Sequence, residues 1–106
     1  RGNAHRTGYY RSILSDALVK HYSISNIYPN PFNTITTIEY MLPKSTDMQI
    51  IVFNILGQII DKLIIGSQTP GVYSIDWDAS KYSSGVYFVS MKTKHFYETR
   101  KILLFK

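Results

Sequence analysis

The chain has 106 residues, of which 44% are hydrophobic and 18% are charged, and its net charge is +5. This length accommodates one domain with a single core, and the composition is that of an ordinary globular protein. No apolar run approaches the roughly 20 residues that span a bilayer, so we expect no transmembrane segment. The absence of cysteine excludes disulfides, thiolate nucleophiles and cysteine-based metal sites.

The N-terminal residues lack the continuous apolar stretch of a secretory signal peptide. If the protein is exported, we expect its export signal to have been removed or to precede Arg1. Basic residues concentrate towards both ends of the chain, and such a pattern could bind nucleic acid or anionic lipid. We interpret them as solvated surface charge and expect no nucleic-acid partner.

Residues 1–22 are expected to form a linker or tail with a short amphipathic helix. The polar, glycine-containing start favours a linker. From Ser12 onward apolar side chains recur at helical spacing, and Ser12 is a suitable N-cap. A helix of about a dozen residues is marginal alone in water, so it needs a packing partner. The side chains available for such assembly contacts are Tyr9, Tyr10, Ile13, Leu14, Leu18 and Tyr22.

Residues 23–106 have the patterns of β-strands. Both faces of 48–55 carry apolar residues, which indicates a central strand that is partly covered on both sides. Turn residues recur about every 8 to 12 positions, as in antiparallel sandwiches. We therefore predict an all-β protein, an antiparallel immunoglobulin-like β-sandwich of six to seven strands. Side-chain alternation predicts strands over 34–42, 72–77, 85–93 and 97–105, and apolar content predicts strands over 48–55 and 58–65.

Several segments of this region look like fold determinants. Two prolines in Tyr28-Pro29-Asn30-Pro31-Phe32-Asn33 stiffen the entry to a strand, with Tyr28 and Phe32 as expected apolar anchors. Asn54 and Gly57 bracket a turn, where glycine permits a positive φ. Gly85 begins a strand at a point where a side chain would clash near Trp77.

Five segments in this order resemble the C-terminal sorting domains of the type IX (Por) secretion system, type A. The resemblance extends from about Ile24 to the last residue. The segments are Tyr28-Pro29-Asn30-Pro31-Phe32-Asn33, Phe53-Asn54-Ile55-Leu56-Gly57-Gln58, Gly71-Val72-Tyr73-Ser74-Ile75-Asp76-Trp77-Asp78, Ser84-Gly85-Val86-Tyr87-Phe88 and Thr99-Arg100-Lys101-Ile102-Leu103-Leu104-Phe105-Lys106.

The resemblance implies a non-catalytic domain that directs a larger, covalently linked upstream cargo across the outer membrane of a Gram-negative bacterium. It implies periplasmic transit, recognition by the translocon, removal by a surface sortase, and a cargo that is secreted or held on the cell surface. A C-terminal strand at a sheet edge could also add to a partner's sheet. The residues expected to be recognised by the secretion machinery are Gly85, Val86, Tyr87, Arg100, Lys101, Ile102, Leu104 and Lys106.

Two other functions stay open. The first is a sandwich retained on the mature protein, which self-associates into a surface array or filament through contacts in residues 1–22. The second is a carbohydrate-binding module, which would need a planar row of exposed aromatic side chains that the sequence does not clearly offer.

Catalytic and metal-binding patterns are weak. The three histidines are scattered, which does not suit a metal site. Asp76 and Asp78, with Asp47 nearby, could ligate calcium, although solvated carboxylates are the more ordinary explanation. The serines lack a Gly-x-Ser-x-Gly motif and a histidine partner. We therefore expect no enzymatic activity, no cofactor and no metal.

Overall fold

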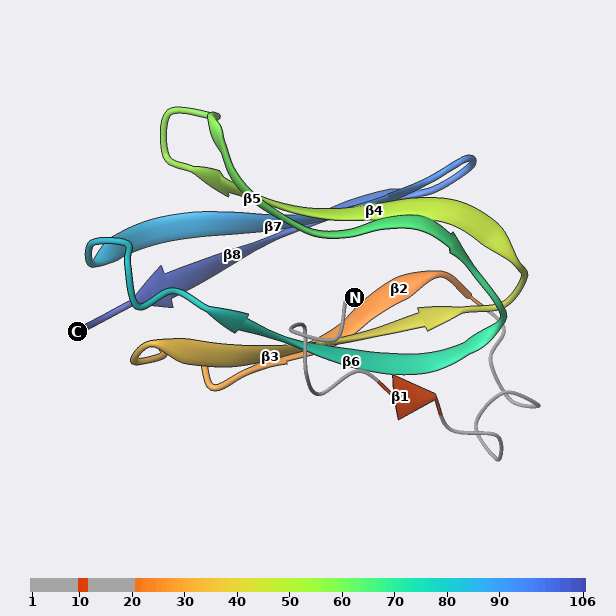
Figure 1. Ribbon diagram of the computed structural model, residues 1–106, viewed down its shortest axis with the longest axis horizontal. Coiled ribbons are helices and arrows are strands. Elements are labelled where there is room, and N and C mark those ends of the chain that lie inside the picture. Colours follow the sequence, from red (N-terminus) through yellow and green to blue (C-terminus); the bar gives the residue numbers. More distant parts are fainter. Residues whose placement is uncertain (1–9, 12–20) are drawn as a thin grey trace.

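Two antiparallel β-sheets pack face to face in the computed structural model, which describes Tyr10–Arg11 and residues 21–106 (Figure 1). Sheet A has the strand order β1 (Tyr10–Arg11), β6 (Gly71–Asp78), β3 (Ile35–Leu42) and β2 (Ser23–Tyr28). Sheet B has the order β5 (Ile59–Gln68), β4 (Thr46–Asn54), β7 (Gly85–Thr93) and β8 (Tyr97–Leu104). The predicted all-β sandwich is confirmed.

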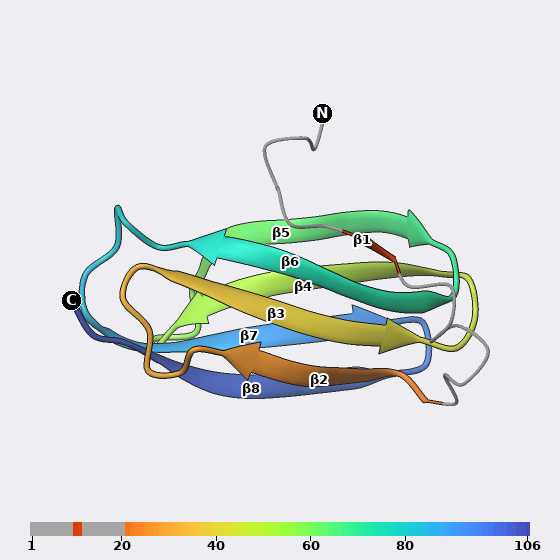
Figure 2. The same ribbon diagram turned by 90° about the horizontal axis from the view of Figure 1, so that it is seen from below.

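The strand order is that of an immunoglobulin-like sandwich. The neighbours β2, β3 and β6 correspond to strands A, B and E of that fold, and β4, β7 and β8 correspond to C, F and G. The strand that follows β4 turns back as a hairpin and pairs with β4 itself, so β5 widens sheet B. Figure 2 shows the two layers from sheet A, with β3 and β6 in its middle.

The core follows from the alternation of side chains along the strands. In β3, every second residue from Thr36 to Leu42 is buried. In β6, the same period buries Tyr73, Ile75 and Trp77, as predicted. Sheet B supplies the opposing apolar side chains, and full burial of each aliphatic one contributes about 1.5–3 kcal/mol. These are Met48, Ile50, Val52, Val89, Met91, Ile102 and Leu104.

Two tyrosines fix the corners where the chain leaves one strand for the next. The hydroxyl of Tyr87 donates to the carbonyl of Ser83 at 2.6 Å, before β7. The hydroxyl of Tyr73 donates to the carbonyl of Thr69 at 2.8 Å, before β6. The first is the tyrosine corner of immunoglobulin-like domains, in which a tyrosine near the start of strand F bonds to the backbone just upstream.

Two strand boundaries differ from the prediction. The predicted strand over 58–65 extends further, to Gln68, because β4 begins at Thr46 and pairs with β5 as far as that residue. β2 is not among the predicted ranges, and a register shift between Ile24 and Asn26 explains why. The bulge breaks the alternation of buried and exposed side chains on which the prediction depends.

Two expectations about single residues are wrong. Tyr28 is not an apolar anchor, because 45% of it is exposed and its hydroxyl donates to Glu39, whereas Phe32 is buried as expected. A Cβ on Gly85 would meet no heavy atom within 4 Å, so no clash requires glycine there. Its φ of +156° is the feature that favours glycine. The turn bracketed by Asn54 and Gly57 is confirmed, with Gly57 at a φ of +80°.

The predicted helix from Ser12 lies outside the residues that the structure describes, as do Tyr9, Ile13, Leu14 and Leu18. Tyr10 is placed by its backbone, which pairs with Ser74 in β6. Within β1 and residues 21–106 we find no apolar helix of membrane-spanning length.

Candidate recognition site

The C-terminal hairpin, β7 and β8, contains all the residues expected to be recognised except Lys106, which follows the end of β8. The two strands pair without interruption from Gly85 opposite Leu104 to Lys92 opposite Tyr97. β8 is one of the two edge strands of sheet B. Its alternation turns Ile102 and Leu104 into the core and leaves Leu103 exposed.

Three of the expected recognition residues are core side chains. Tyr87, Ile102 and Leu104 are buried, and Tyr87 packs edge-on against Trp77 with ring centroids 5.6 Å apart. In the folded domain these side chains position the hairpin. Gly85 and Val86 are half-buried at the start of β7.

Arg100 is exposed but is held by two partners. Its Nε donates to Oε2 of Glu98 at 2.7 Å, and its Nη2 donates to the carbonyl oxygen of Ile24 at 2.5 Å. Glu98 in turn accepts from the Ile24 N–H through Oε1 at 2.9 Å. The pair therefore ties β8 to β2 across one open side of the sandwich. As an exposed ion pair it contributes no more than about 1 kcal/mol.

Lys106 joins the C-terminal end of the domain to the loop between β6 and β7. Its backbone N–H donates to Oγ of Ser84 at 3.0 Å, and its Nζ donates to the carbonyl of Ser80 at 2.7 Å. Hydrogen bonds from the backbone and side chain of Ser80 hold the pKa of Asp78 below its ordinary value, and the charge of Lys106 adds to this effect.

A segment far away in the sequence closes the outer edge of β8. We call Asn30–Phe32 the edge latch. The N–H of Phe32 donates to the carbonyl of Leu103 at 2.9 Å, and the N–H of Phe105 donates to the carbonyl of Phe32 at 2.9 Å. The Asn30 side chain accepts from the Leu103 N–H at 3.0 Å and donates to the Lys101 carbonyl at 3.3 Å.

The latch is anchored through Phe32. That side chain is buried, and its ring lies 5.7 Å from the ring of Trp77. The peptide bonds before Pro29 and Pro31 are both cis. An unpaired strand edge invites pairing with another chain, and here the edge from Lys101 to Phe105 is already paired. Strand addition to β8 is thus restricted to its earlier part, around Tyr97 and Thr99.

The calcium hypothesis is wrong. Asp76 accepts from Oγ1 of Thr37 at 2.7 Å, and Asp47 is engaged by the hydroxyl of Ser67. Asp47 belongs to the start of β4 and Asp78 to the end of β6, and these strand ends lie at opposite ends of the sandwich (Figure 1). No group of three metal-ligating side chains occurs among the residues described by the structure.

The two sheets and the C-terminal hairpin together define a β-sandwich domain. Its exposed surface near the C-terminus consists of strand β8 and charged side chains. The chain matches the family described as the secretion system C-terminal sorting domain over residues 26–104, about three quarters of its length. It belongs to that family, the C-terminal sorting domains of type IX secretion, which target cargo for secretion across the outer membrane. Searches of curated proteins and of solved structures found no significant match.

Membership of the family establishes three general properties of the chain: its lack of catalysis, its kind of partner and the destination of its cargo. Sorting domains of this kind are non-catalytic signals, so the chain is not an enzyme. They interact with the type IX secretion machinery. Their cargo is secreted or held on the cell surface of Bacteroidetes-type bacteria.

Proposed function

We propose that the secretion machinery recognises the folded domain through exposed residues of its last strand and the two residues after it, with Lys101, Leu103, Phe105 and Lys106 as the main contacts. The supporting observation is the alternation in β8, where Ile102 and Leu104 are anchored in the core and their neighbours are exposed. A partner on this side meets a basic and apolar strip on a rigid strand, which favours specific recognition.

An export assay tests this recognition strip. Residues 23–106 are fused to a reporter in a host with type IX secretion, and Lys101→Glu is compared with the unmodified fusion. We expect Lys101→Glu to reduce export strongly without changing thermal stability, because the exposed Lys101 side chain forms no hydrogen bond or ion pair with the residues that the structure describes. Lys44→Glu, which reverses an exposed lysine in the turn before β4, is the matched control. Normal export of Lys101→Glu would show that the strip is not recognised.

We propose further that a surface sortase is the second partner and removes the domain upstream of β2 after periplasmic transit. The described core begins at Ile24, so cleavage before β2 leaves these core side chains together. Mass spectrometry of the secreted protein is the direct measurement. Absence of peptides from residues 23–106 supports removal, whereas their retention favours the alternative of an assembly subunit in a surface array or filament.

One contact bears on that alternative. Tyr22, one of the side chains expected to mediate assembly, stacks on Phe96 with ring centroids 5.7 Å apart. This ring is therefore partly occupied within the domain, which favours the sorting function over self-association through Tyr22.

A further inference from the structure

The outer face of sheet B is uncovered by any other described element and carries an unusual mixture of side chains. The strand register brings β4, β7 and β8 side by side. The residues that face outward come from positions alternate to the core. They are Gln49, Ile51 and Phe53 on β4, Val86, Phe88, Ser90 and Lys92 on β7, and Tyr97, Thr99, Lys101 and Leu103 on β8.

Three adjoining hollows run along this face. One of about 370 Å³ lies at the start of β4, and it shares Gln49 and Lys92 with a second of about 230 Å³. The second shares Phe53 and Tyr97 with a third of about 340 Å³, which ends at the β4–β5 turn. We call this series the β4–β7 groove. It follows β4 from Asp47 to Asn54, a length of about 23 Å at about 3.3 Å per residue.

The middle of the groove is apolar. Ile51 is only 9% exposed although it points away from the core, because its neighbours on the outer face surround it. Tyr97 and Ile59 stand beside it and are more than half exposed. Hydrogen bonds from Ser90 and then Thr99 lower the pKa of the Tyr97 phenol, and the charge of Lys92 adds to this effect. An exposed apolar surface of this kind commonly marks a binding site.

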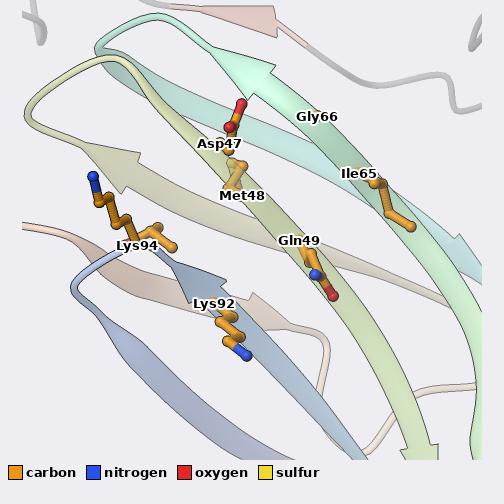
Figure 3. Close-up of a pocket in the computed structure, with 8 residues that line it drawn as sticks. Asp47, Met48, Gln49, Ile65, Gly66, Lys92 and Lys94 are labelled. Carbon is orange, nitrogen blue, oxygen red and sulfur yellow. The ribbon is translucent and has the colours of Figure 1, made fainter.

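The end of the groove near the β7–β8 turn is positively charged. Figure 3 shows Lys92 on β7 beside Gln49 on β4, with Lys94 at the end of the hairpin. Neither lysine forms an ion pair with another residue that the structure describes. The one carboxylate in this hollow, Asp47, accepts from the hydroxyl of Ser67.

The outer face of sheet A has the opposite character. Its alternate positions carry the carboxylates of Glu39, Asp76 and Asp78. Hydroxyl groups satisfy two of them, since Tyr28 donates to Glu39 and Thr37 donates to Asp76. The basic and apolar surface is therefore a property of sheet B in particular.

We propose that the β4–β7 groove binds an extended segment of a partner protein that is acidic at one end and apolar along the rest. Its straight course suits seven or eight extended residues, and Lys92 and Lys94 complement carboxylates at one end. β4 and β7 are both paired on their two sides, so the partner is held by side chains in hollows and not by strand addition. None of the residues that line the groove is one of the proposed recognition contacts, although Lys101 and Leu103 lie beside the groove on the same outer face. The inference does not rest on the proposed function.

A binding measurement with the full chain tests the groove. The probes are two sets of synthetic octapeptides, one with Asp-Glu at the N-terminus and one with Asp-Glu at the C-terminus. In both sets the other six residues alternate between threonine and an apolar residue, which is valine, leucine or phenylalanine. Versions with Lys-Lys in place of Asp-Glu are the charge controls. We expect acidic probes to shift the amide NMR signals of Gln49, Phe53, Phe88 and Lys92, and lysine probes to bind at least tenfold more weakly.

Variants of the protein separate the two halves of the groove. Lys92→Glu combined with Lys94→Glu should weaken binding of the acidic probe about tenfold, since two favourable charge contacts become repulsive. Tyr97→Ser should weaken it several-fold, and this residue is exposed enough to leave folding intact. Lys81→Glu, in the loop at the other end of β7, is the matched control and should bind as the unmodified chain does.

Three results would overturn the proposal. They are signal changes confined to residues outside the groove, equal binding of acidic and lysine probes, and the absence of binding by every acidic probe. Vesicles that contain phosphatidylglycerol are tested in parallel. If they displace the acidic probe and bind more tightly than it does, the surface is a membrane contact and the peptide proposal is wrong. Because no export step is involved, these outcomes are independent of the reporter assay.

Discussion

The outer edge of β8 is covered in different ways along its two halves. From Lys101 to Phe105, the edge latch takes up the outward backbone groups of the strand. From Tyr97 to Arg100, only the side chains of Glu98 and Arg100 reach across, to the backbone of Ile24. The first closure uses backbone hydrogen bonds and a buried aromatic anchor, and the second uses an exposed ion pair. The half of β8 that bears the proposed contacts is therefore the half whose backbone edge is more strongly protected against pairing with another chain.

The largest expected effect comes from removing the anchor of the latch. Phe32→Ala deletes a buried ring that packs on Trp77, and we expect the free energy of unfolding to fall by about 3–5 kcal/mol. Urea unfolding followed by tryptophan fluorescence measures this change. Phe105→Ala, which removes an exposed phenylalanine nearby, should cost much less. Equal losses for the two variants would show that Phe32 is not an anchor.

The second-largest effect is expected from exposing the backbone edge of β8 that Asn30 covers. Asn30→Ala removes both side-chain hydrogen bonds to β8, which should cost about 1 kcal/mol. The free Leu103 N–H and Lys101 carbonyl should then promote pairing between copies. Analytical ultracentrifugation is expected to detect dimers or larger species of Asn30→Ala. Asn33→Ala should remain monomeric, and an equally monomeric Asn30→Ala would contradict the protective role of the latch.

The ion pair between Arg100 and Glu98 is expected to contribute less to stability than the latch does. Arg100→Ala should lower the free energy of unfolding by no more than about 1 kcal/mol, because the ion pair with Glu98 is exposed. The loss should shrink when the unfolding is repeated at high salt, which screens the pair. A loss as large as that of Phe32→Ala would mean that the two halves of β8 are closed equally strongly.

The smallest effect concerns pH at the C-terminal end. Because the folded domain lowers the pKa of Asp78, its contribution to stability is complete above the ordinary carboxyl pKa and disappears as pH falls through the lowered value. NMR titration of the Asp78 carboxyl should give a value below 3.8. Ser80→Ala, which removes the side-chain hydrogen bond and keeps the backbone one, should return it part of the way. A titration at or above 3.8 in the unmodified chain would contradict this.

Much of the sandwich could be predicted because alternation is a local signal. The inward side chains of β3, β6 and β7 are those that the period of two indicates. The central position of β4 follows from apolar residues on both of its faces, but no other described element supplies the expected cover over its outer face. β2 escaped prediction because its register shift breaks the period.

The site was predicted less completely, for a physical reason. The latch joins residues more than 70 positions apart, and no local pattern specifies such pairing. One clue is the amide of Asn30 between two prolines, since it offers a donor and an acceptor where the prolines offer no N–H. Likewise, the resemblance marked Tyr87, Ile102 and Leu104 without separating residues that build the hairpin from residues that a partner can contact.

The latch also bears on the order in which the domain is completed. Its hydrogen bonds link residues 30–32 with residues 101–105. During synthesis, the second partner of each bond emerges from the ribosome only after nearly all of the sandwich has been made. Contacts so distant in sequence are slow to form, so the domain matures late. A chain interrupted before β8 would lack both the closing strand and the residues that we propose are recognised.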